Sequence, residues 1–365
     1  MNSKFSLFLL GAVALLSSCR KDNGEPEATP IVSKGIYVLN EGGFEQNNSS
    51  LSYFDFAGKV ATSNIFASAN AGASAGDIGN DVQVYGAKMY IIMNNSNLIH
   101  IVEAKSAKKI KSINMIIDGV KTLPRSVAFA KGKAFVSAYN DKVYVIDTIT
   151  LAIEKSIGVG RDPEGLAVVG NKLYVANSGG LGYLTNETQD KTVSVIDLTT
   201  FTEIKKIEVP LNPKTIVADK YGDIYVATVG NYANIPANLV VIDSKTDLIK
   251  KKFDIPVTGI AIRNDIAYMY KAVYAYATNS YVIGYFTLNV QNETITSEKF
   301  ITDDTDKAIK IPYGLAVDPI SGDVFISDAN DFQNPGTVYC FDQTGKKKYS
   351  FIAGIIPGHF AFYTK

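Results

Sequence analysis

The stretch Lys172-Leu173-Tyr174-Val175-Ala176-Asn177 has the composition of a β-strand, with an aromatic residue between two aliphatic ones after a polar start. A closely similar order recurs along the chain, in six further copies at Gly35–Val38, Lys88–Ile91, Lys133–Val136, Asp223–Val226, Ile266–Met269 and Asp323–Ile326. Over the 332 residues from Lys34 to Lys365, seven copies give about 47 residues each. A four-stranded blade of a β-propeller needs about 40–50 residues.

Each copy is flanked by other strand patterns in the order that a blade requires. A strand of small apolar residues precedes it, as at Gly165–Val169, and a strand ending in Asp follows it, as at Val193–Asp197. A charged alternating stretch such as Glu203–Val209 closes the unit, as expected for an outermost strand with one face in water. The sequence therefore predicts an all-β fold, a seven-bladed β-propeller of four-stranded antiparallel blades.

The two ends of the repeat region predict how the ring closes. The chain enters at Gly35 on a second strand with no innermost strand before it. It ends at His359–Tyr363, an innermost strand with nothing after it. The C-terminal strand is thus expected to join the first blade beside Ile36–Asn40, which leaves no free sheet edge in the ring. One propeller over residues 34–365, without a second domain, follows.

The N-terminal segment has the pattern of an export signal. Residues 1–18 carry one early cation, Lys4, before an apolar run that is too short to span a bilayer. The run ends in Leu16-Ser17-Ser18-Cys19, which resembles a bacterial lipobox, so we expect cleavage before Cys19 and lipidation of its thiol. Residues 19–33 are then a flexible tether. The alternative is an ordinary signal peptide with an incidental cysteine.

Composition excludes several classes of protein. The chain has 36 Lys and Arg against 36 Asp and Glu, and this zero balance gives no electrostatic reason to expect a nucleic acid as partner. Two His and two Cys are too few for a zinc cluster, an iron–sulfur cluster or a disulfide framework. The absence of Trp argues against a quinone stacked on an aromatic floor, and we expect no cofactor.

Two kinds of loop predict two different faces. One face has short turns that begin with Asp147, Asp197, Asp243 and Asp342, which we interpret as Asx turns rather than catalytic acids. The other face has longer loops rich in Gly, Asn and aromatic residues, a composition typical of adaptable binding surfaces. The alternative for each aromatic residue is that it only packs its own loop. The candidate binding aromatics are Phe44, Tyr183, Tyr232, Tyr274, Tyr276 and Phe332.

The strand ends on this variable face predict a polar mouth around the propeller axis. The expected first residues of the innermost strands are Asp77, Arg125, Glu164, Lys214, Thr258, Tyr313 and His359. The expected last residues of the second strands are Glu41, Asn94, Asn140, Asn177, Thr228, Lys271 and Asp328. A mouth of mixed charge and many amides fits a large, neutral or zwitterionic ligand. From these sets we predict ligand contacts at Glu41, Asn94, Arg125, Asn140, Asn177, Lys214, Tyr313, Asp328 and His359.

No pattern predicts a catalytic residue. A Ser–His–acid triad is not evident, and His100 falls on the polar phase of its strand, so we expect it to point outward. Glu41, Asn177 and Asp328 match the carboxylate and amide ligands of a lactonase-like divalent-metal site, which is an alternative to binding alone. A third possibility is a module that binds a glycan or another envelope protein.

The repeat units Lys172–Asn177 and Asp223–Thr228 resemble those of YVTN/YncE-like propellers. The two ends are more similar to surface lipoproteins that capture cobalamin (vitamin B12) for a TonB-dependent transporter. The matching segments are Asn40-Glu41-Gly42-Gly43-Phe44 with Leu51–Asp55, and Tyr313–Asp318 with Asp328–Phe332 and Gly354–Gly358. The resemblance implies a non-enzymatic protein, lipid-anchored to the bacterial outer membrane, that binds a corrinoid and passes it to the transporter.

Overall fold

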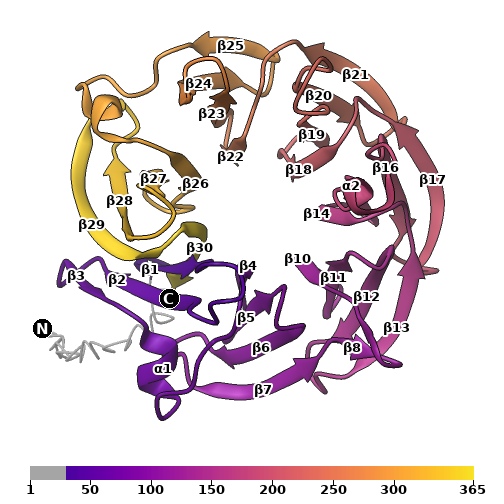
Figure 1. The fold of residues 1–365 in the computed structure, drawn as a ribbon, viewed down its shortest axis with the longest axis horizontal. Helices are drawn as coiled ribbons and strands as arrows, with labels where there is room; N and C mark the ends of the chain where they lie inside the picture. Colours follow the sequence, from indigo (N-terminus) through magenta and orange to yellow (C-terminus); the bar gives the residue numbers. More distant parts are fainter. Residues whose placement is uncertain (1–29) are drawn as a thin grey trace, which may run out of the picture. The chain divides into compact units, whose positions relative to one another are not determined.

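Seven four-stranded antiparallel sheets stand in a ring around a central axis, as the computed structural model shows (Figure 1). The structure describes residues 30–365, except for the side chains of Tyr183 and Thr185. The predicted signal segment 1–18, Cys19 and most of the tether lie outside the described residues. The prediction of a seven-bladed propeller is confirmed.

We number the blades in chain order and name their strands from the axis outward. Blade 1 is β30 (Pro357–Thr364), β1 (Ser33–Asn40), β2 (Ser50–Asp55) and β3 (Val60–Thr62); blade 2 is β4 (Gly79–Tyr85), β5 (Lys88–Met93), β6 (Leu98–Glu103) and β7 (Lys109–Asn114). Blade 3 is β10 (Pro124–Ala130), β11 (Lys133–Ala138), β12 (Lys142–Asp147) and β13 (Ile153–Gly158); blade 4 is β14 (Pro163–Val169), β15 (Lys172–Asn177), β16 (Thr192–Asp197) and β17 (Thr202–Glu208).

Blade 5 is β18 (Pro213–Ala218), β19 (Asp223–Thr228), β20 (Asn238–Asp243) and β21 (Leu248–Phe253); blade 6 is β22 (Gly259–Arg263), β23 (Ile266–Ala275), β24 (Ser280–Asn289) and β25 (Thr294–Ser297). Blade 7 is β26 (Pro312–Val317), β27 (Val324–Asp328), β28 (Pro335–Phe341) and β29 (Lys347–Ile355). The connections contain α1 (Ile65–Ala69), α2 (Gly182–Thr185), a 3₁₀ turn (Thr305–Ala308) and a small hairpin, β8 (Ile116–Ile117) and β9 (Val120–Lys121).

The aromatic residue of each repeat is what joins neighbouring blades. All seven, namely Tyr37, Tyr90, Phe135, Tyr174, Tyr225, Tyr268 and Phe325, are at most 4% exposed. Three of the tyrosines also reach into another blade or its connection: the Tyr37 hydroxyl donates to the Ala104 carbonyl, that of Tyr174 to Asp247 at 2.6 Å, and that of Tyr225 to the Val290 carbonyl at 3.3 Å. Burying such a side chain stabilises the fold by roughly 1.5–3 kcal/mol. The aromatic residue of the repeat therefore also stabilises the contacts between neighbouring blades.

The ring closes as predicted, because β30 pairs antiparallel with β1 in the first blade. Tyr37 faces Ala361 in this register, and Ile36 faces Phe362. Two further hydrogen bonds extend one end of the pairing, from Val32 N to Lys365 O at 3.0 Å and from Lys365 N to Val32 O at 2.9 Å.

The short turns are Asx turns, as predicted. The Asp147 carboxylate accepts the amides of Ile149 at 3.0 Å and Thr150 at 2.7 Å, and Asp197 accepts the corresponding amides of Thr199 and Thr200. These carboxylates stabilise their own turns by accepting backbone amides.

The expectation that His100 points outward is wrong. His100 is buried, with its ring nitrogens 2.7 Å from the Ala75 carbonyl and 2.8 Å from the Ser112 hydroxyl. Its ring also packs against Phe66 of α1 at 4.9 Å between centroids. The connection from blade 1 to blade 2 therefore covers this strand, and burial lowers the pKa of His100.

Candidate functional site: a polar mouth at the propeller axis

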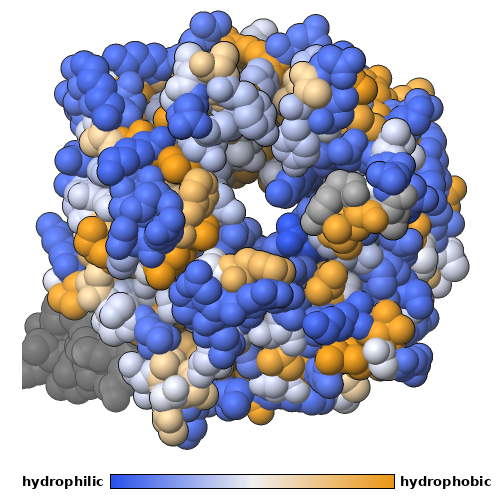
Figure 2. All heavy atoms as spheres, in the orientation of Figure 1, coloured by the Kyte–Doolittle hydropathy of each residue, from blue (hydrophilic) through white to orange (hydrophobic). Residues whose placement is uncertain are grey.

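A cavity of about 410 Å³ lies where the innermost strands begin, and all seven blades contribute to its wall. Figure 2 shows the corresponding opening at the centre of the ring, bordered mostly by hydrophilic residues. Five of the predicted ligand contacts line this cavity, namely Glu41, Arg125, Lys214, Tyr313 and His359. Glu164, which was predicted for the mouth but not as a ligand contact, lines it as well.

Proline residues explain why these side chains reach the cavity. Strands β10, β14, β18, β26 and β30 each begin with Pro, at Pro124, Pro163, Pro213, Pro312 and Pro357. The strand pairing shifts register directly after each of these prolines, so a bulge follows in every case. Pro has no N–H to donate to the neighbouring strand, and a β-bulge changes the direction of the side chains at the bulge. The side chain of the residue after Pro is therefore turned toward the axis. Arg125, Glu164, Lys214 and Tyr313 all occupy this position.

The cation–carboxylate pair of Arg125 and Glu164 joins blades 3 and 4 at the mouth. The guanidinium Nη2 lies 2.8 Å from Glu164 Oε2, and Nε donates to the same oxygen at 2.9 Å. The two side chains are only 13% and 6% exposed. The Tyr139 hydroxyl donates to the other carboxylate oxygen of Glu164, and Arg125 lies over the Tyr139 ring at 4.7 Å. Both charged groups are therefore held in one position.

The electrostatic effects within this pair agree with its geometry. Burial alone would raise the pKa of Glu164, but Arg125, and after it Lys214, hold that pKa below its ordinary value. Burial alone would lower the pKa of Arg125, but the Glu164 carboxylate raises it above its ordinary value. Both groups stay charged at neutral pH.

A second polar group joins blades 1 and 7. The Tyr313 hydroxyl donates to Glu41 Oε2 at 2.9 Å, and His359 Nε2 lies 3.1 Å from Glu41 Oε1. Burial, and then the Glu41 carboxylate, raise the pKa of Tyr313 well above its ordinary value, so this phenol remains a donor. The Phe332 ring packs edge-on against Tyr313 at 5.8 Å, which links a variable loop to the mouth.

Blade 2 supplies two mouth residues that the sequence prediction missed. Strand β4 begins at Gly79, so Asn80 and Asp81 line the cavity, and the expected first residue, Asp77, does not. The side-chain amide nitrogen of Asn80 donates to the Arg125 carbonyl at 3.0 Å, and its oxygen accepts a bond from the Arg125 guanidinium. Asp81 accepts the Val127 amide at 2.9 Å. Burial raises the pKa of Asp81. The sequence signal for these residues is the similarity of Gly79-Asn80-Asp81-Val82 to Pro124-Arg125-Ser126-Val127, which places Asn80 at the position of Arg125.

Blade 6 also departs from the prediction. Thr258 does not line the cavity, and its hydroxyl accepts the Ala272 amide at 2.9 Å. Strand β22 pairs with β23 in continuous register from Gly259, so no bulge turns Thr258 toward the axis. Blade 6 contributes an apolar residue, Ile260, to the cavity wall.

Four predicted contacts at the ends of second strands lie outside the cavity. Asn177 is fully buried and donates to Thr192 and Ser194 at 2.9 Å, and the Asp328 carboxylate accepts the amides of Lys310, Ile311 and Asn330. The amide of Asn94 donates to the Pro124 carbonyl at 3.1 Å, and that of Asn140 donates to the Tyr144 hydroxyl at 2.8 Å. These side chains hold strands and loops together beside the mouth.

The predicted aromatics are mostly exposed on the loops around this mouth. Phe44 and Tyr232 are each 67% exposed and Tyr276 is 79% exposed. Tyr274 packs edge-on against Tyr276 at 5.1 Å, within the hairpin β23–β24. Its two strands have ten residues each, whereas the second and third strands of the other blades have at most eight. The side chain of Tyr183 lies outside the described residues.

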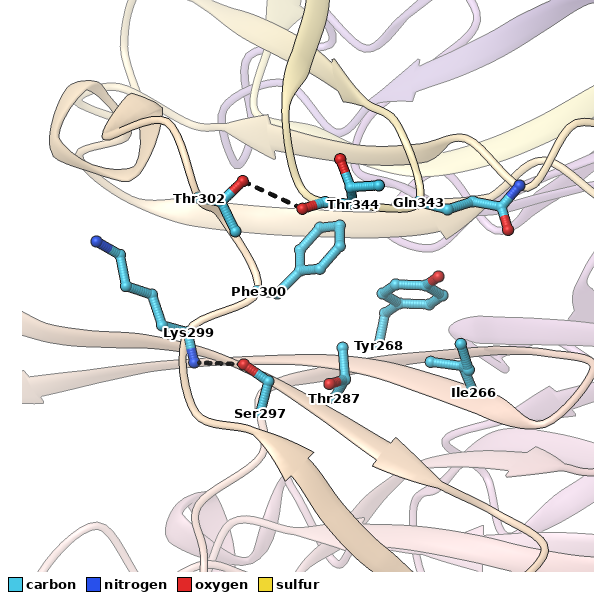
Figure 3. A pocket seen from close by; sticks show the side chains of 9 residues that line it. All are labelled: Ile266, Tyr268, Thr287, Ser297, Lys299, Phe300, Thr302, Gln343 and Thr344. Carbon is cyan, nitrogen blue, oxygen red and sulfur yellow. Dashed lines mark hydrogen bonds between the residues drawn. The ribbon is translucent and has the colours of Figure 1, made fainter.

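A second cavity, of about 210 Å³, lies between blades 6 and 7 (Figure 3). Tyr268, Thr287 and Ser297 come from blade 6, and Phe300 follows it, while Gln343 and Thr344 come from a short turn of blade 7. The Thr302 hydroxyl donates to the Thr344 carbonyl at 3.1 Å across this junction. None of the predicted site residues lines it.

The lactonase-like alternative needs Glu41, Asn177 and Asp328 around one ion. Within residues 30–365, no three His, Cys, Asp or Glu side chains are grouped so that they could hold a metal ion. Asn177 and Asp328 are instead engaged inside their own blades. The same part of the chain contains no helix that is long and apolar enough to span a membrane.

Ring, closure and mouth define the class of protein: a closed seven-bladed β-propeller with a polar central cavity. The chain belongs to the family described as Domain of unknown function (DUF5074), whose model matches residues 34–354. A search of curated proteins found no match.

Solved structures share the fold at low sequence identity. A quinonprotein alcohol dehydrogenase-like protein from Bacteroides thetaiotaomicron is 16% identical, with a TM-score of 0.61 over 90% of this chain and 78% of that one. Hydrazine synthase from Kuenenia stuttgartiensis is 15% identical, with a TM-score of 0.59 over 73% and 76%. The Pan2 WD40 domain from Neurospora crassa is 12% identical, with a TM-score of 0.57 over 76% and 80%.

Proposed function

We propose that this protein is a non-enzymatic ligand-capture propeller, and that its ligand is cobalamin or a related corrinoid. The observation that carries the proposal is the combination of exposed aromatics on one face, Phe44, Tyr232 and Tyr276, with the rigid polar mouth at the axis. Exposed aromatics over a preorganised polar frame are a usual composition of binding surfaces. The corrinoid itself is suggested by the resemblance of the two chain ends.

The size of the cavity sets how such a ligand would bind. Pockets for drug-sized ligands have about 300–1,000 Å³, and the mouth has about 410 Å³. A corrinoid is larger than a drug-sized ligand, so it would lie across the mouth and place only one polar group in the cavity. The loop aromatics would then cover its apolar edges, and the mouth would bind its amides.

The cellular setting belongs to the same proposal. The segment ending at Cys19 supports export and lipid anchoring, so the propeller would stand on the bacterial outer membrane, tethered by residues 19–33. A TonB-dependent transporter that receives the captured ligand is the partner that the resemblance suggests.

Calorimetry with cyanocobalamin tests the proposal. The triple substitution Tyr232→Ala, Tyr276→Ala and Phe332→Ala should weaken binding at least 30-fold, because one aromatic anchor alone contributes about 2 kcal/mol or more. The matched control replaces Thr150, Thr200 and Thr246, exposed on the short turns, and should leave the affinity unchanged.

Two outcomes would contradict the proposal. Equal affinities of the two triple variants would place the site elsewhere on the propeller. No binding heat from the wild type would exclude cyanocobalamin, and a glycan array with the same variants would then test the envelope-interaction alternative.

A further inference from the structure

Lys214 is a charged group of the mouth without a hydrogen bond or ion pair among residues 30–365. It follows Pro213 at the start of β18, its side chain is exposed, and it lines the central cavity. Its ammonium makes no hydrogen bond or ion pair with any residue that the structure describes. The other charged groups of the cavity differ from it in this respect.

Each of those other groups is already engaged. Arg125 pairs with Glu164, and Glu41 binds Tyr313 and His359. Asp81 accepts the Val127 amide at 2.9 Å and the Gln83 amide at 3.2 Å. A ligand can form a new ion pair with Lys214 without breaking any of these contacts.

The charges are also distributed unevenly around the ring. Glu41 and Asp81 belong to blades 1 and 2, whereas Arg125, Glu164 and Lys214 belong to blades 3 to 5 and together carry one net positive charge. Blade 5 lies across the axis from blade 1 (Figure 1). The cavity thus has a cationic side at Lys214 and an acidic side at Glu41 and Asp81.

Glu164 does not neutralise Lys214. Arg125 and, after it, Lys214 lower the pKa of Glu164, but both carboxylate oxygens of Glu164 already accept bonds from Arg125 and Tyr139. The other lining residues of blades 5 and 6 are Thr215, Ile216 and Ile260, which offer no anion. In a partly enclosed cavity, an ion pair is stronger than it is on an open surface.

We propose that Lys214 binds a carboxylate or phosphate group of the ligand, and that the opposite side of the cavity receives a hydrogen-bond donor or cation of the same ligand. The identity of the whole ligand rests on the proposed function above. The anion-binding role of Lys214 does not, because it follows from the unpaired charge in the cavity. The recognised chemistry is that of a dipolar or zwitterionic group.

Methyl NMR on the full propeller tests the inference with inorganic phosphate and acetate as probes. The methyl signals of Ile216 and Ile260, which line the cavity, should shift in a saturable way when phosphate replaces chloride at constant ionic strength. The methyl of Ile149, on an exposed short turn of another blade, should not shift. Saturation by acetate as well as phosphate indicates a carboxylate-sized site, and saturation by phosphate alone indicates a phosphate site.

Lys214→Met should weaken the phosphate titration at least about fivefold, which corresponds to about 1 kcal/mol for loss of a solvent-accessible ion pair. Lys214→Arg should retain phosphate binding. That result would show that the loss of binding in Lys214→Met comes from the lost charge and not from a change in the fold. Lys252→Met, on the outer strand β21 of the same blade, is the matched control and should change nothing.

Unsaturable shifts in the wild type, or equal titrations for Lys214→Met and Lys252→Met, would overturn the inference. Its failure is separable from that of the proposed function. Phosphate binding without cyanocobalamin binding keeps the anion site and rejects the corrinoid. Cyanocobalamin binding that is unchanged in Lys214→Met keeps the corrinoid and rejects the anion site.

Discussion

Replacing Arg125 by Met should destabilise the propeller strongly, because it leaves the Glu164 carboxylate charged and buried without its main partner. The side chains of the pair are 13% and 6% exposed, and the carboxylate keeps only the Tyr139 hydroxyl. Removing one partner of a buried ion pair costs about 3–5 kcal/mol. The pair joins blades 3 and 4, so this loss falls on an interface between blades.

The expected change in melting temperature follows from the size of the domain. The unit Val32–Lys365 has 334 residues. At about 2.1 cal/mol/K per residue, its unfolding entropy is about 0.7 kcal/mol/K, so a loss of about 4 kcal/mol lowers Tm by about 6 °C. The double variant Arg125→Met with Glu164→Met removes both charges and should recover most of this loss.

Differential scanning calorimetry at pH 7 measures these changes. Arg161→Met is the control, since Arg161 and Glu187 form a pair with side chains 35% and 58% exposed, and loss of a surface pair costs about 0–1 kcal/mol. A Tm of Arg125→Met within 1 °C of the wild type would refute the reasoning. So would a double variant that is less stable than Arg125→Met itself.

The same pair predicts the direction of a pH effect. The pKa of Glu164 lies below its ordinary value of 4.5, so the stabilisation from its charge is present above that pH and is lost as the pH falls further. Wild-type stability should therefore fall more steeply below pH 4.5 than that of Glu164→Gln. Parallel curves for the two proteins would contradict the assignment.

Two further predictions concern the ends of the chain. Deleting His359–Lys365 removes most of β30 and exposes the inner edge of β1, so the protein should aggregate or lose its cooperative unfolding transition; a truncated protein that melts like the full chain would contradict ring closure by this strand. Replacing Cys19 by Ala should release the protein from membranes without changing its circular dichroism spectrum; membrane association that persists in detergent-free fractionation would show a different anchor.

The fold was predictable because its main signal is local and repeated. Each blade carries the same buried aromatic position, exemplified by Tyr174, and seven copies along the chain leave little choice of architecture. The closing strand was predictable by counting, since an innermost strand was missing at one end and present at the other.

The mouth was predictable only where the repeat is regular. Arg125, Glu164, Lys214 and Tyr313 follow a proline at a fixed place in their blades, but blade 2 has Gly79 there, and its contribution was placed at Asp77 instead of Asn80. A register error of a few residues is enough to move a side chain away from the axis.

Burial by distant segments was not predictable from periodicity. Asn177 and Asp328 end their strands as expected. However, Asn177 donates to the Ser194 hydroxyl, and Asp328 accepts the Ile311 amide, because buried polar groups need hydrogen-bond partners. His100 is likewise covered by a connection some 25 residues earlier in the chain. Such contacts depend on how loops fold back, which a strand pattern does not encode.

The pairing of β1 with β30 also has a consequence for the order of folding. Tyr37 and Ala361 face each other although they are 324 positions apart in the chain. Bringing such ends together from an unfolded chain costs ~3 kcal/mol more than closing a ten-residue loop. The blades between them form from hairpins, and each folded blade shortens the distance that remains. We therefore expect β30 to pair with β1 only after the intervening blades have folded, so that this one pairing completes the ring.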